Sequence, residues 1–181
     1  MKRTLIHLIL PAALLIVGIC VHISSSARAE TPSGDSTRPS NPSYSHTDTR
    51  RFELPDSVWK KVLLPDLYKV ARHGATEKAF TGKYLNFNAR GTYYCAACGN
   101  ALFRSSAKLD STSGWASFSE TVHPGSVIYR RDTSFGMSRT EVLCARCEAH
   151  LGHLFNDGPT TGKRYSINSI SLEFLPDQKT E

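Results

Sequence analysis

The sequence predicts a mainly β domain with a short helical segment at its N-terminal end. Helical spacing of apolar residues is found in residues 54–72 and fades beyond them. After residue 90 the apolar runs are short and separated by Gly, Asn and Pro, which is typical of strands joined by turns. Two Cys-x-x-Cys pairs each begin where a β-type run ends, as in the turns that bind structural zinc.

Residues 1–29 have the pattern of a secretory signal peptide, so we expect the mature protein to be periplasmic or secreted. Lys2 and Arg3 precede a mostly apolar run from residue 5 to residue 23, and Ala27-Arg28-Ala29 is a small-residue cleavage site. The alternative is an uncleaved membrane anchor, because the apolar run is just long enough to span a bilayer. Membrane contact is expected only in that case.

The rest of the chain divides into a linker, one domain and a tail. Residues 30–50 are rich in Ser, Thr and Pro with almost no apolar residues, so we expect a disordered linker. Residues 51–176 have the length of one domain, and residues 177–181 form the tail. The formal charge is +6, but without the basic residues of the signal peptide 19 basic residues remain against 16 acidic ones. Because no run of like charge is present, nucleic-acid binding is not expected.

Two short helices are expected at the start of the domain. Asp56 begins a segment with apolar residues three and four apart, and Pro65 should end it. Residues 66–72 predict a second helix, which Gly74 stops. The β-type runs that follow cover residues 92–95, 101–103, 126–130, 141–144 and 164–175.

The last β-type run carries polar residues that would share one face. Successive side chains of a strand point to opposite faces, so Arg164, Ser166 and Asn168 would line up with apolar residues further along. Such a strand would anchor its apolar end in the core and present its polar end to a site. The alternative is a strand whose first half simply emerges into solvent.

Four cysteines remain after the signal peptide, in the pairs Cys95/Cys98 and Cys144/Cys147. Soft thiolates select zinc or iron–sulfur clusters over hard cations, and the spacing is typical of a tetrahedral Zn²⁺ site. A metal that joins two distant parts of the chain adds its binding energy to folding. Two alternatives remain open: two disulfides, which are common in exported proteins, or a redox-active dithiol in one pair.

His150 and His153 are the candidate acid groups. They would face opposite ways on a straight strand, so we expect Gly152 between them to bend the chain and bring them together. An imidazole in a pocket is the usual general acid. The alternative is that one of them binds zinc, which four cysteines make unnecessary.

Between residues 54 and 175 a series of short motifs follows in a fixed order: Gly74-Ala-Thr-Glu77, Ala79-Phe-Thr-Gly82, Tyr94-Cys-Ala-Ala-Cys-Gly99, Leu102-Phe103, Lys108-Leu-Asp-Ser111, Gly114-Trp-Ala-Ser-Phe118, Arg139-Thr-Glu-Val142, Cys144-x-x-Cys147, His150-Leu-Gly-His153, Asn156-Asp-Gly-Pro159 and Arg164-Tyr-Ser-Ile-Asn-Ser-Ile-Ser-Leu172. With these motifs the chain resembles the B-type methionine sulfoxide reductases, the peptide-methionine (R)-S-oxide reductases. The resemblance implies two antiparallel sheets and a structural zinc held by both Cys pairs. The implied substrates are oxidised methionine residues in exported proteins and free methionine-R-sulfoxide.

The resemblance also implies roles for individual residues. In that family a thiolate attacks the sulfoxide sulfur while a histidine protonates the oxygen, and an external thiol reductant or a second cysteine restores the resulting sulfenic acid. By motif, Trp115 packs on the substrate methyl group, and His150 and His153 contact and protonate the sulfoxide oxygen. Arg164 and Asn168 flank the nucleophile.

The nucleophile position holds a serine, Ser166, which is the main departure from the family pattern. A hydroxyl is a hard, weakly acidic nucleophile and cannot become a sulfenic acid, so we expect impaired activity. Ser113 occupies the position of the recycling cysteine, and Ala116 replaces the usual Pro. One alternative is a non-catalytic binder of methionine sulfoxide or oxidised proteins. The other is a purely structural zinc module, which would have no need of Trp115 or the histidines.

Overall fold

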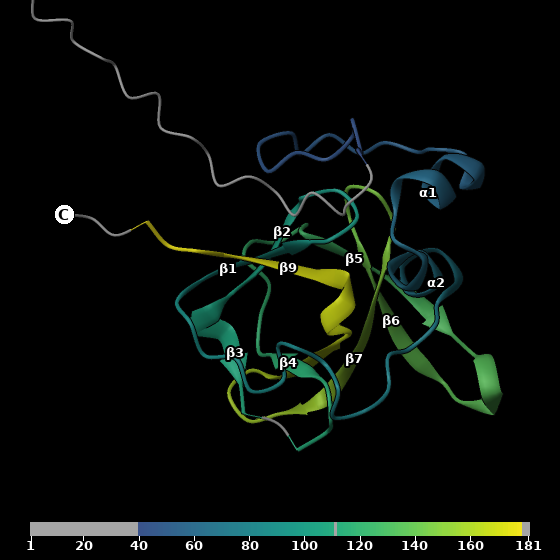
Figure 1. The fold of residues 1–181 in the computed structure, drawn as a ribbon. Helices are drawn as coiled ribbons and strands as arrows, with labels where there is room; N and C mark the ends of the chain where they lie inside the picture. The colour runs from purple at the N-terminus through teal and green to yellow at the C-terminus, as the bar shows by residue number, and fades with distance from the viewer. Residues whose placement is uncertain (1–39, 111, 179–181) are drawn as a thin grey trace, which may run out of the picture. The chain divides into compact units, whose positions relative to one another are not determined.

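The computed structural model describes residues 40–110 and 112–178 of the chain (Figure 1). The expected signal peptide, residues 1–29, lies outside the described residues, as does the first half of the expected linker. Within the part that the structure describes, no helix has the length and apolar character needed to cross a membrane.

Two short helices open the domain, as the sequence predicts. They are α1 (Asp56–Val62) and α2 (Pro65–His73), and α2 packs against the strand and the turn that carry the candidate site (Figure 1). Pro65 is the first residue of α2, where a missing backbone N–H leaves no helical hydrogen bond unmade. Gly74 ends α2 in the left-handed conformation with φ of 66°, which glycine adopts without strain.

All strands pair antiparallel, in two sheets. The first has the order β2-β1-β9, and the second has the order β3-β4-β8-β7-β6-β5. The first comprises β1 (Gly91–Cys95), β2 (Ala101–Arg104) and β9 (Leu172–Pro176). The second comprises β3 (Lys108–Leu109), β4 (Ala116–Phe118), β5 (Val127–Asp132), β6 (Arg139–Cys144), β7 (His150–Gly158) and β8 (Gly162–Ile167). Single 3₁₀ turns are η1 (Ser105–Ala107), η2 (Ser134–Gly136) and η3 (Ser169–Ser171). The predicted mainly β fold with two antiparallel sheets is confirmed.

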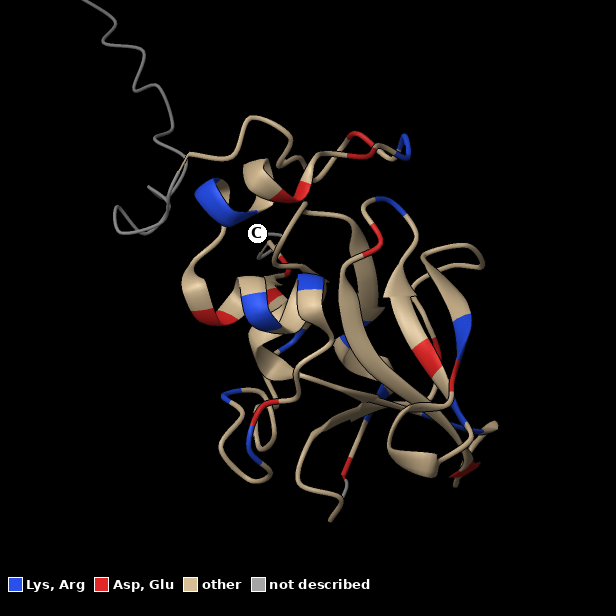
Figure 2. Ribbon diagram, turned by 90° about the vertical axis from the view of Figure 1, so that its right-hand side faces the viewer, with Lys and Arg blue, Asp and Glu red and all other residues tan. Residues whose placement is uncertain are grey.

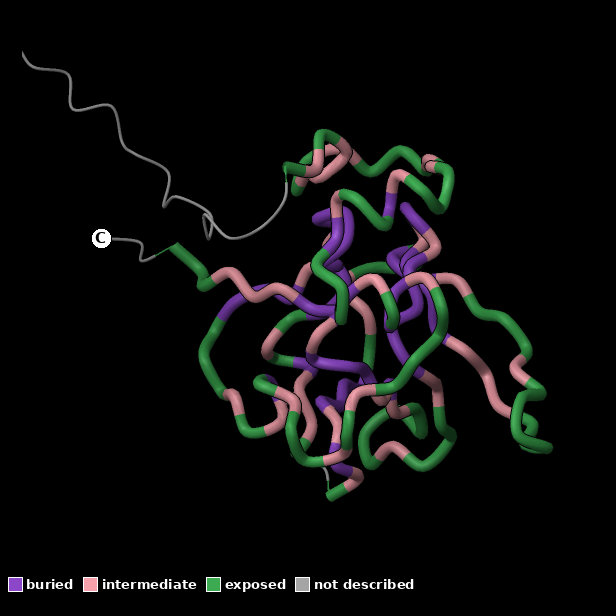
Figure 3. Tube along the Cα trace, turned by 45° about the vertical axis from the view of Figure 1, so that its right-hand side comes forward, coloured by how far each residue is buried: buried purple, intermediate pink, exposed green. Residues whose placement is uncertain are grey.

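An aromatic core joins the two sheets. Phe103 on β2 stacks on Phe118 of β4 with ring centroids 4.3 Å apart, and Tyr93 on β1 meets Phe118 edge-on at 4.9 Å. All three residues are fully buried. Figure 3 colours the buried positions along the chain purple. Large aromatic rings bury much apolar surface, so this cluster holds one sheet against the other. Acidic and basic positions are interspersed over the elements around this core (Figure 2).

The expected single strand over residues 164–175 is wrong. Strand β8 ends at Ile167, η3 turns the chain, and β9 continues in the other sheet. The turn forms because long-range hydrogen bonds replace the strand ladder. Both the backbone N–H and the side-chain amide of Asn168 donate to the carbonyl of Leu151, at 2.8 and 3.0 Å. Arg164 and Ser166 therefore share a face of β8, whereas Ile170 lies in η3, and Leu172 and Phe174 lie in β9 of the other sheet.

The folded part begins upstream of residue 51, which corrects the C-terminal boundary of the expected linker. The side-chain amide of Asn41 donates to the carbonyl of Ala97 at 2.8 Å, and the backbone N–H of Ser45 donates to the carbonyl of Cys98 at 3.0 Å. The buried Arg146 donates to the carbonyl of Ser43 at 3.0 Å. These contacts form because the two cysteine turns offer backbone carbonyls and a guanidinium, which composition alone does not reveal.

Candidate functional site

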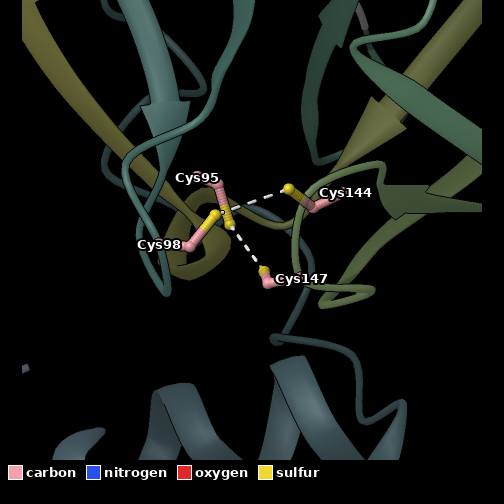
Figure 4. Close-up of side chains that lie close together, drawn as sticks. All are labelled: Cys95, Cys98, Cys144 and Cys147. Atoms are coloured by element: carbon pink, nitrogen blue, oxygen red, sulfur yellow. Dashed lines mark hydrogen bonds between the residues drawn. The ribbon is translucent and has the colours of Figure 1, made fainter. Parts of the chain in front are cut away.

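Two turns of the same construction hold the four cysteines. In the turn after β1 the N–H of Gly99 donates to the carbonyl of Cys95 at 2.8 Å, and in the turn after β6 the N–H of Glu148 donates to the carbonyl of Cys144 at 2.9 Å. Gly99 and Glu148 both have a left-handed backbone, with φ of 81° and 55°. The turns come from different sheets and face each other across the domain interior (Figure 4).

The four sulfurs have the spacing of a tetrahedral metal site. Sγ of Cys95 lies 3.8 Å from Sγ of Cys147, Sγ of Cys98 lies 3.6 Å from Sγ of Cys144, and all four lie within 4.8 Å of one another (Figure 4). A Zn²⁺ ion about 2.3 Å from each sulfur places neighbouring sulfurs about 3.8 Å apart. A disulfide needs about 2.05 Å, so these cysteines do not form disulfides with one another. The residues present therefore fit a metal ion.

Groups around the sulfurs orient the tetrad. The side-chain amide of Asn100 donates to Sγ of Cys144 at 3.6 Å and to the carbonyl of Ser126 at 3.0 Å. Nη1 of Arg146 donates to the carbonyl of Cys98 at 2.5 Å, which ties one cysteine turn to the other. Neither histidine of the His150-x-x-His153 motif belongs to this cluster, so the reading in which a histidine binds the metal is wrong.

A bulge in β7 brings the two histidines together. Val142 on β6 pairs with Gly152, but the next residue, Leu143, pairs with His150, so Leu151 is an extra residue in the ladder. The imidazole centroids of His150 and His153 lie 5.5 Å apart. Gly152 is required because a Cβ there would lie 2.0 Å from the carbonyl oxygen of Ser166 on the adjacent strand.

Each imidazole is held by a carboxylate from the same sheet, one from the adjacent strand β6 and one from β5 beyond it. Nδ1 of His150 lies 2.7 Å from Oε1 of Glu141, and Nε2 of His153 lies 2.8 Å from Oδ2 of Asp132. Asp132 also accepts a hydrogen bond from Arg139 at 2.5 Å. Nε2 of His150 is buried and has no hydrogen-bond partner among the described residues. Sequence reasoning missed both carboxylates, since strand register decides which acid meets which histidine.

Ser166 lies in a row of polar residues that crosses the six-stranded sheet. In the register of the ladders, Glu141 on β6 faces His153 on β7, which faces Ser166 on β8, which faces Ser117 on β4. Directly paired residues of antiparallel strands project from the same face with Cβ atoms about 4.5–5.5 Å apart. The hydroxyl of Ser166 therefore stands beside the imidazole that Asp132 holds.

Arg164 shares the Ser166 face of β8 and makes a stacked ion pair. Its guanidinium donates two hydrogen bonds of 2.9 Å to the carboxylate of Asp157 and lies over the ring of Phe155, 4.6 Å from the ring centroid. Its Nη1 atom is buried and has no partner in the described part of the chain. The two hydrogen bonds and the ring contact thus fix the direction of the guanidinium.

Trp115 and Asn168 both contact Glu77, which is part of a family motif but has no role assigned from the sequence. Nε1 of Trp115 donates to the backbone carbonyl of Glu77 at 3.2 Å, and Oδ1 of Asn168 accepts from the backbone N–H of Glu77 at 3.0 Å. Both ends of the Asn168 amide are engaged within the protein, because its Nδ2 atom donates to Leu151. The amide of Asn168 therefore joins the backbone of Glu77 to the backbone of Leu151.

Burial controls the protonation of His153. Desolvation lowers its pKa below the usual 6.5, and nearby Arg139 adds to this, while the carboxylate of Asp132 acts in the opposite direction. The hydrogen bond from His150 lowers the pKa of Glu141, so that carboxylate stays ionised. Because the unfolded chain binds a proton more readily than folded His153, this group costs stability as the pH falls below about 6.5.

We expect His153 to titrate with a midpoint below 6.5, and Asp132→Asn to lower that midpoint further by removing the carboxylate that favours the imidazolium. The measurement is a pH titration of the imidazole C–H signals by NMR. Glu120→Gln, which removes an exposed carboxylate, serves as the control and should leave the midpoint unchanged. A midpoint above 6.5 in the unchanged protein would contradict this assignment.

Comparison with known proteins agrees with the geometry. Residues 63–176 match the model of the SelR domain. The chain is 54% identical over 122 residues to the peptide methionine sulfoxide reductase MsrB of Thiobacillus denitrificans, covering 67% of this chain and 92% of that protein. It is 47% identical over 131 residues to that of Methanosarcina barkeri, covering 72% and 92%. The chain therefore belongs to the SelR domain family, the B-type methionine sulfoxide reductases.

Proposed function

We propose that this chain is an exported relative of the methionine-R-sulfoxide reductases that keeps the sulfoxide pocket but has lost the thiol nucleophile. The observation that carries the proposal is the position of Ser166, which faces His153 across the β7–β8 ladder in a protein otherwise close to the reductases. The proposed substrates are oxidised methionine residues of proteins and free methionine-R-sulfoxide. Export rests on the pattern of residues 1–29 alone.

The chemistry explains why the change matters. Reduction of a sulfoxide by a thiolate forms a sulfur–oxygen bond to the protein as methionine leaves, and the sulfenic acid is then reduced by an external thiol. The same transfer to a serine oxygen would form a weak oxygen–oxygen bond. The hydroxyl is also far less acidic than a thiol, so little of it is ionised near neutral pH. With Ser166 at this position, the first step, which forms a sulfur–oxygen bond to the protein, cannot take place.

The remaining groups have roles that do not depend on the nucleophile. The Trp115 indole offers an apolar surface to the sulfoxide methyl group, and the anchored imidazoles of His150 and His153 offer hydrogen bonds to its oxygen. The four cysteines hold a structural Zn²⁺ ion, for which their spacing fits. In a variant with a cysteine at position 166, an external thiol would act as the reductant.

A non-catalytic binder is the second candidate. It is favoured by the intact His–carboxylate pairs beside a hydroxyl that cannot carry out reduction. Such a protein would recognise oxidised methionine in an unfolded or damaged partner and release it unchanged.

We expect the unmodified chain to bind a peptide with methionine-R-sulfoxide at least about tenfold more tightly than the same peptide with methionine, a difference of about 1.4 kcal/mol. The difference arises because only the sulfoxide oxygen can accept hydrogen bonds from the imidazoles. Isothermal titration calorimetry measures both affinities, with the S epimer as a stereochemical control and Trp115→Ala as the pocket control. Equal affinity for the R sulfoxide and for methionine would show that no sulfoxide pocket remains.

A further inference from the structure

The loop between α2 and β1 places Glu77 at the junction of the candidate site. The backbone carbonyl of Glu77 accepts the indole N–H of Trp115 at 3.2 Å, and its backbone N–H donates to Oδ1 of Asn168 at 3.0 Å. One residue outside the helices and strands thus contacts two residues that the sequence assigned to the site. Hydrogen bonds at both backbone groups fix the plane of the indole relative to the end of β8.

The side chain of Glu77 locks this residue onto the turn that follows Ser166. Oε1 accepts the backbone N–H of Ser169 at 2.8 Å, and Oε2 accepts the backbone N–H of Ile170 at 3.0 Å. Hydrogen bonds to an ionised acceptor are about twice as strong as neutral ones, and two from one carboxylate leave it little freedom to rotate. The Glu77 carboxylate therefore also stabilises the turn in which the chain leaves β8 and enters η3.

The absence of a side chain at Gly82 leaves room for the Glu77 carboxylate. A Cβ at Gly82 would lie 2.5 Å from Oε1 of Glu77 and 2.4 Å from Oγ of Ser169, which is too close for any side chain. The hydroxyl of Ser169 accepts a hydrogen bond from the backbone N–H of Tyr84 at 3.2 Å, which holds the middle of the same loop. The loop therefore follows its path because Glu77 and Gly82 both meet η3.

We propose that Glu77 is the positioning residue of the sulfoxide pocket. It holds the Trp115 indole, the wall for the substrate methyl group, in a set position relative to the nucleophile position on β8. Glu77 does not touch the reacting atoms and acts through Trp115 and the turn at Asn168. This inference rests on the proposed function, because that function assigns the indole to the substrate.

The kinetic test uses Ser166→Cys protein as the background, with methionine-R-sulfoxide as substrate and dithiothreitol as reductant. Glu77→Ala should lower kcat/KM by roughly 30- to 100-fold, with a raised KM, because a displacement of about 1 Å at a binding wall has effects of this size. Glu77→Gln should lose less, since its amide oxygen still accepts one of the two N–H groups. Lys78→Ala is the matched control, because Lys78 is the exposed neighbour in the same loop, and it should stay within about twofold.

A second readout needs no turnover. In the protein that retains Ser166, Glu77→Ala and Glu77→Gln should shift or broaden the indole N–H resonance of Trp115 while that of the buried Trp59 stays in place. An unmoved Trp115 resonance, or a kcat/KM loss no larger than that of Lys78→Ala, would overturn the positioning role. If Ser166→Cys protein is inert but the Trp115 resonance responds to Glu77 and not to Lys78, the proposed function fails and the positioning role stands.

Discussion

Ser166→Cys is expected to raise turnover of methionine-R-sulfoxide with dithiothreitol on the order of 10³-fold over the unmodified chain. Loss of a nucleophile that acts with an acid as one unit commonly costs several orders of magnitude in rate, so restoring it should return much of that loss. The other groups are in place: His153 faces this position across the ladder, and Arg164 shares its face of β8. A nearby positive charge favours the thiolate, which is the reactive form.

The matched control is Ser117→Cys. Ser117 lies directly opposite Ser166 on β4, so this variant puts a thiol on the same face one strand away. It should remain inactive, because the thiol is then displaced from the imidazole. Without dithiothreitol, Ser166→Cys protein should release one equivalent of methionine and leave a sulfenic acid that dimedone traps, since the four described cysteines are engaged in the tetrad.

Two outcomes would contradict this reading. Substantial activity of the unmodified chain would mean that another group carries out the reduction. A well-folded Ser166→Cys protein that stays inert would mean that the pocket no longer fits the sulfoxide, and the binder would become the better description.

Zinc removal is expected to lower the melting temperature by at least about 15 °C. The sulfur tetrad brings together the turn after β1 in one sheet and the turn after β6 in the other, so a bound ion would link the two sheets. Structural zinc contributes roughly 10–16 kcal/mol in small zinc-binding peptides, and about 4 kcal/mol corresponds to this shift for a domain of this size.

Metal analysis should find one zinc per chain, and differential scanning calorimetry with and without a chelator should show the shift. Re-addition of Zn²⁺ to the chelated protein is the control and should restore the original melting temperature. Protein without zinc, or with Cys95–Cys98 and Cys144–Cys147 as disulfides, would contradict the zinc site.

Much of the site chemistry could be predicted from the sequence, because it depends on residue types at short spacing. The two Cys-x-x-Cys pairs specify four thiolates whatever the path between them, and Ser166 is recognised by its neighbours in the chain. Helix ends are equally local: Gly74 ends α2 as predicted, and Pro65, predicted to end the first helix, is the first residue of α2. These features follow from covalent structure and nearest neighbours.

Local patterns failed where long-range hydrogen bonds decide the backbone path. Alternation predicted one strand over residues 164–175, but the side chains of Asn168 and Glu77 form hydrogen bonds across 91 or more positions, and the chain turns from β8 in the second sheet to β9 in the first. Strand β7 escaped prediction because its histidines and glycines lack the usual β-branched pattern, and pairing with β6 and β8 forms it instead.

The sequence by itself determined the family, the mainly β class, the metal-type cysteines and the absence of a thiol at position 166. Only the tertiary structure decided that Glu141 and Asp132 orient the imidazoles, that residues 41–48 pack on the cysteine turns, and that Glu77 joins Trp115 to Asn168. The physical reason is the separation along the chain between the groups that interact. Residue type and neighbouring spacing set what chemistry is available, whereas strand register and the closure of distant loops set which groups meet.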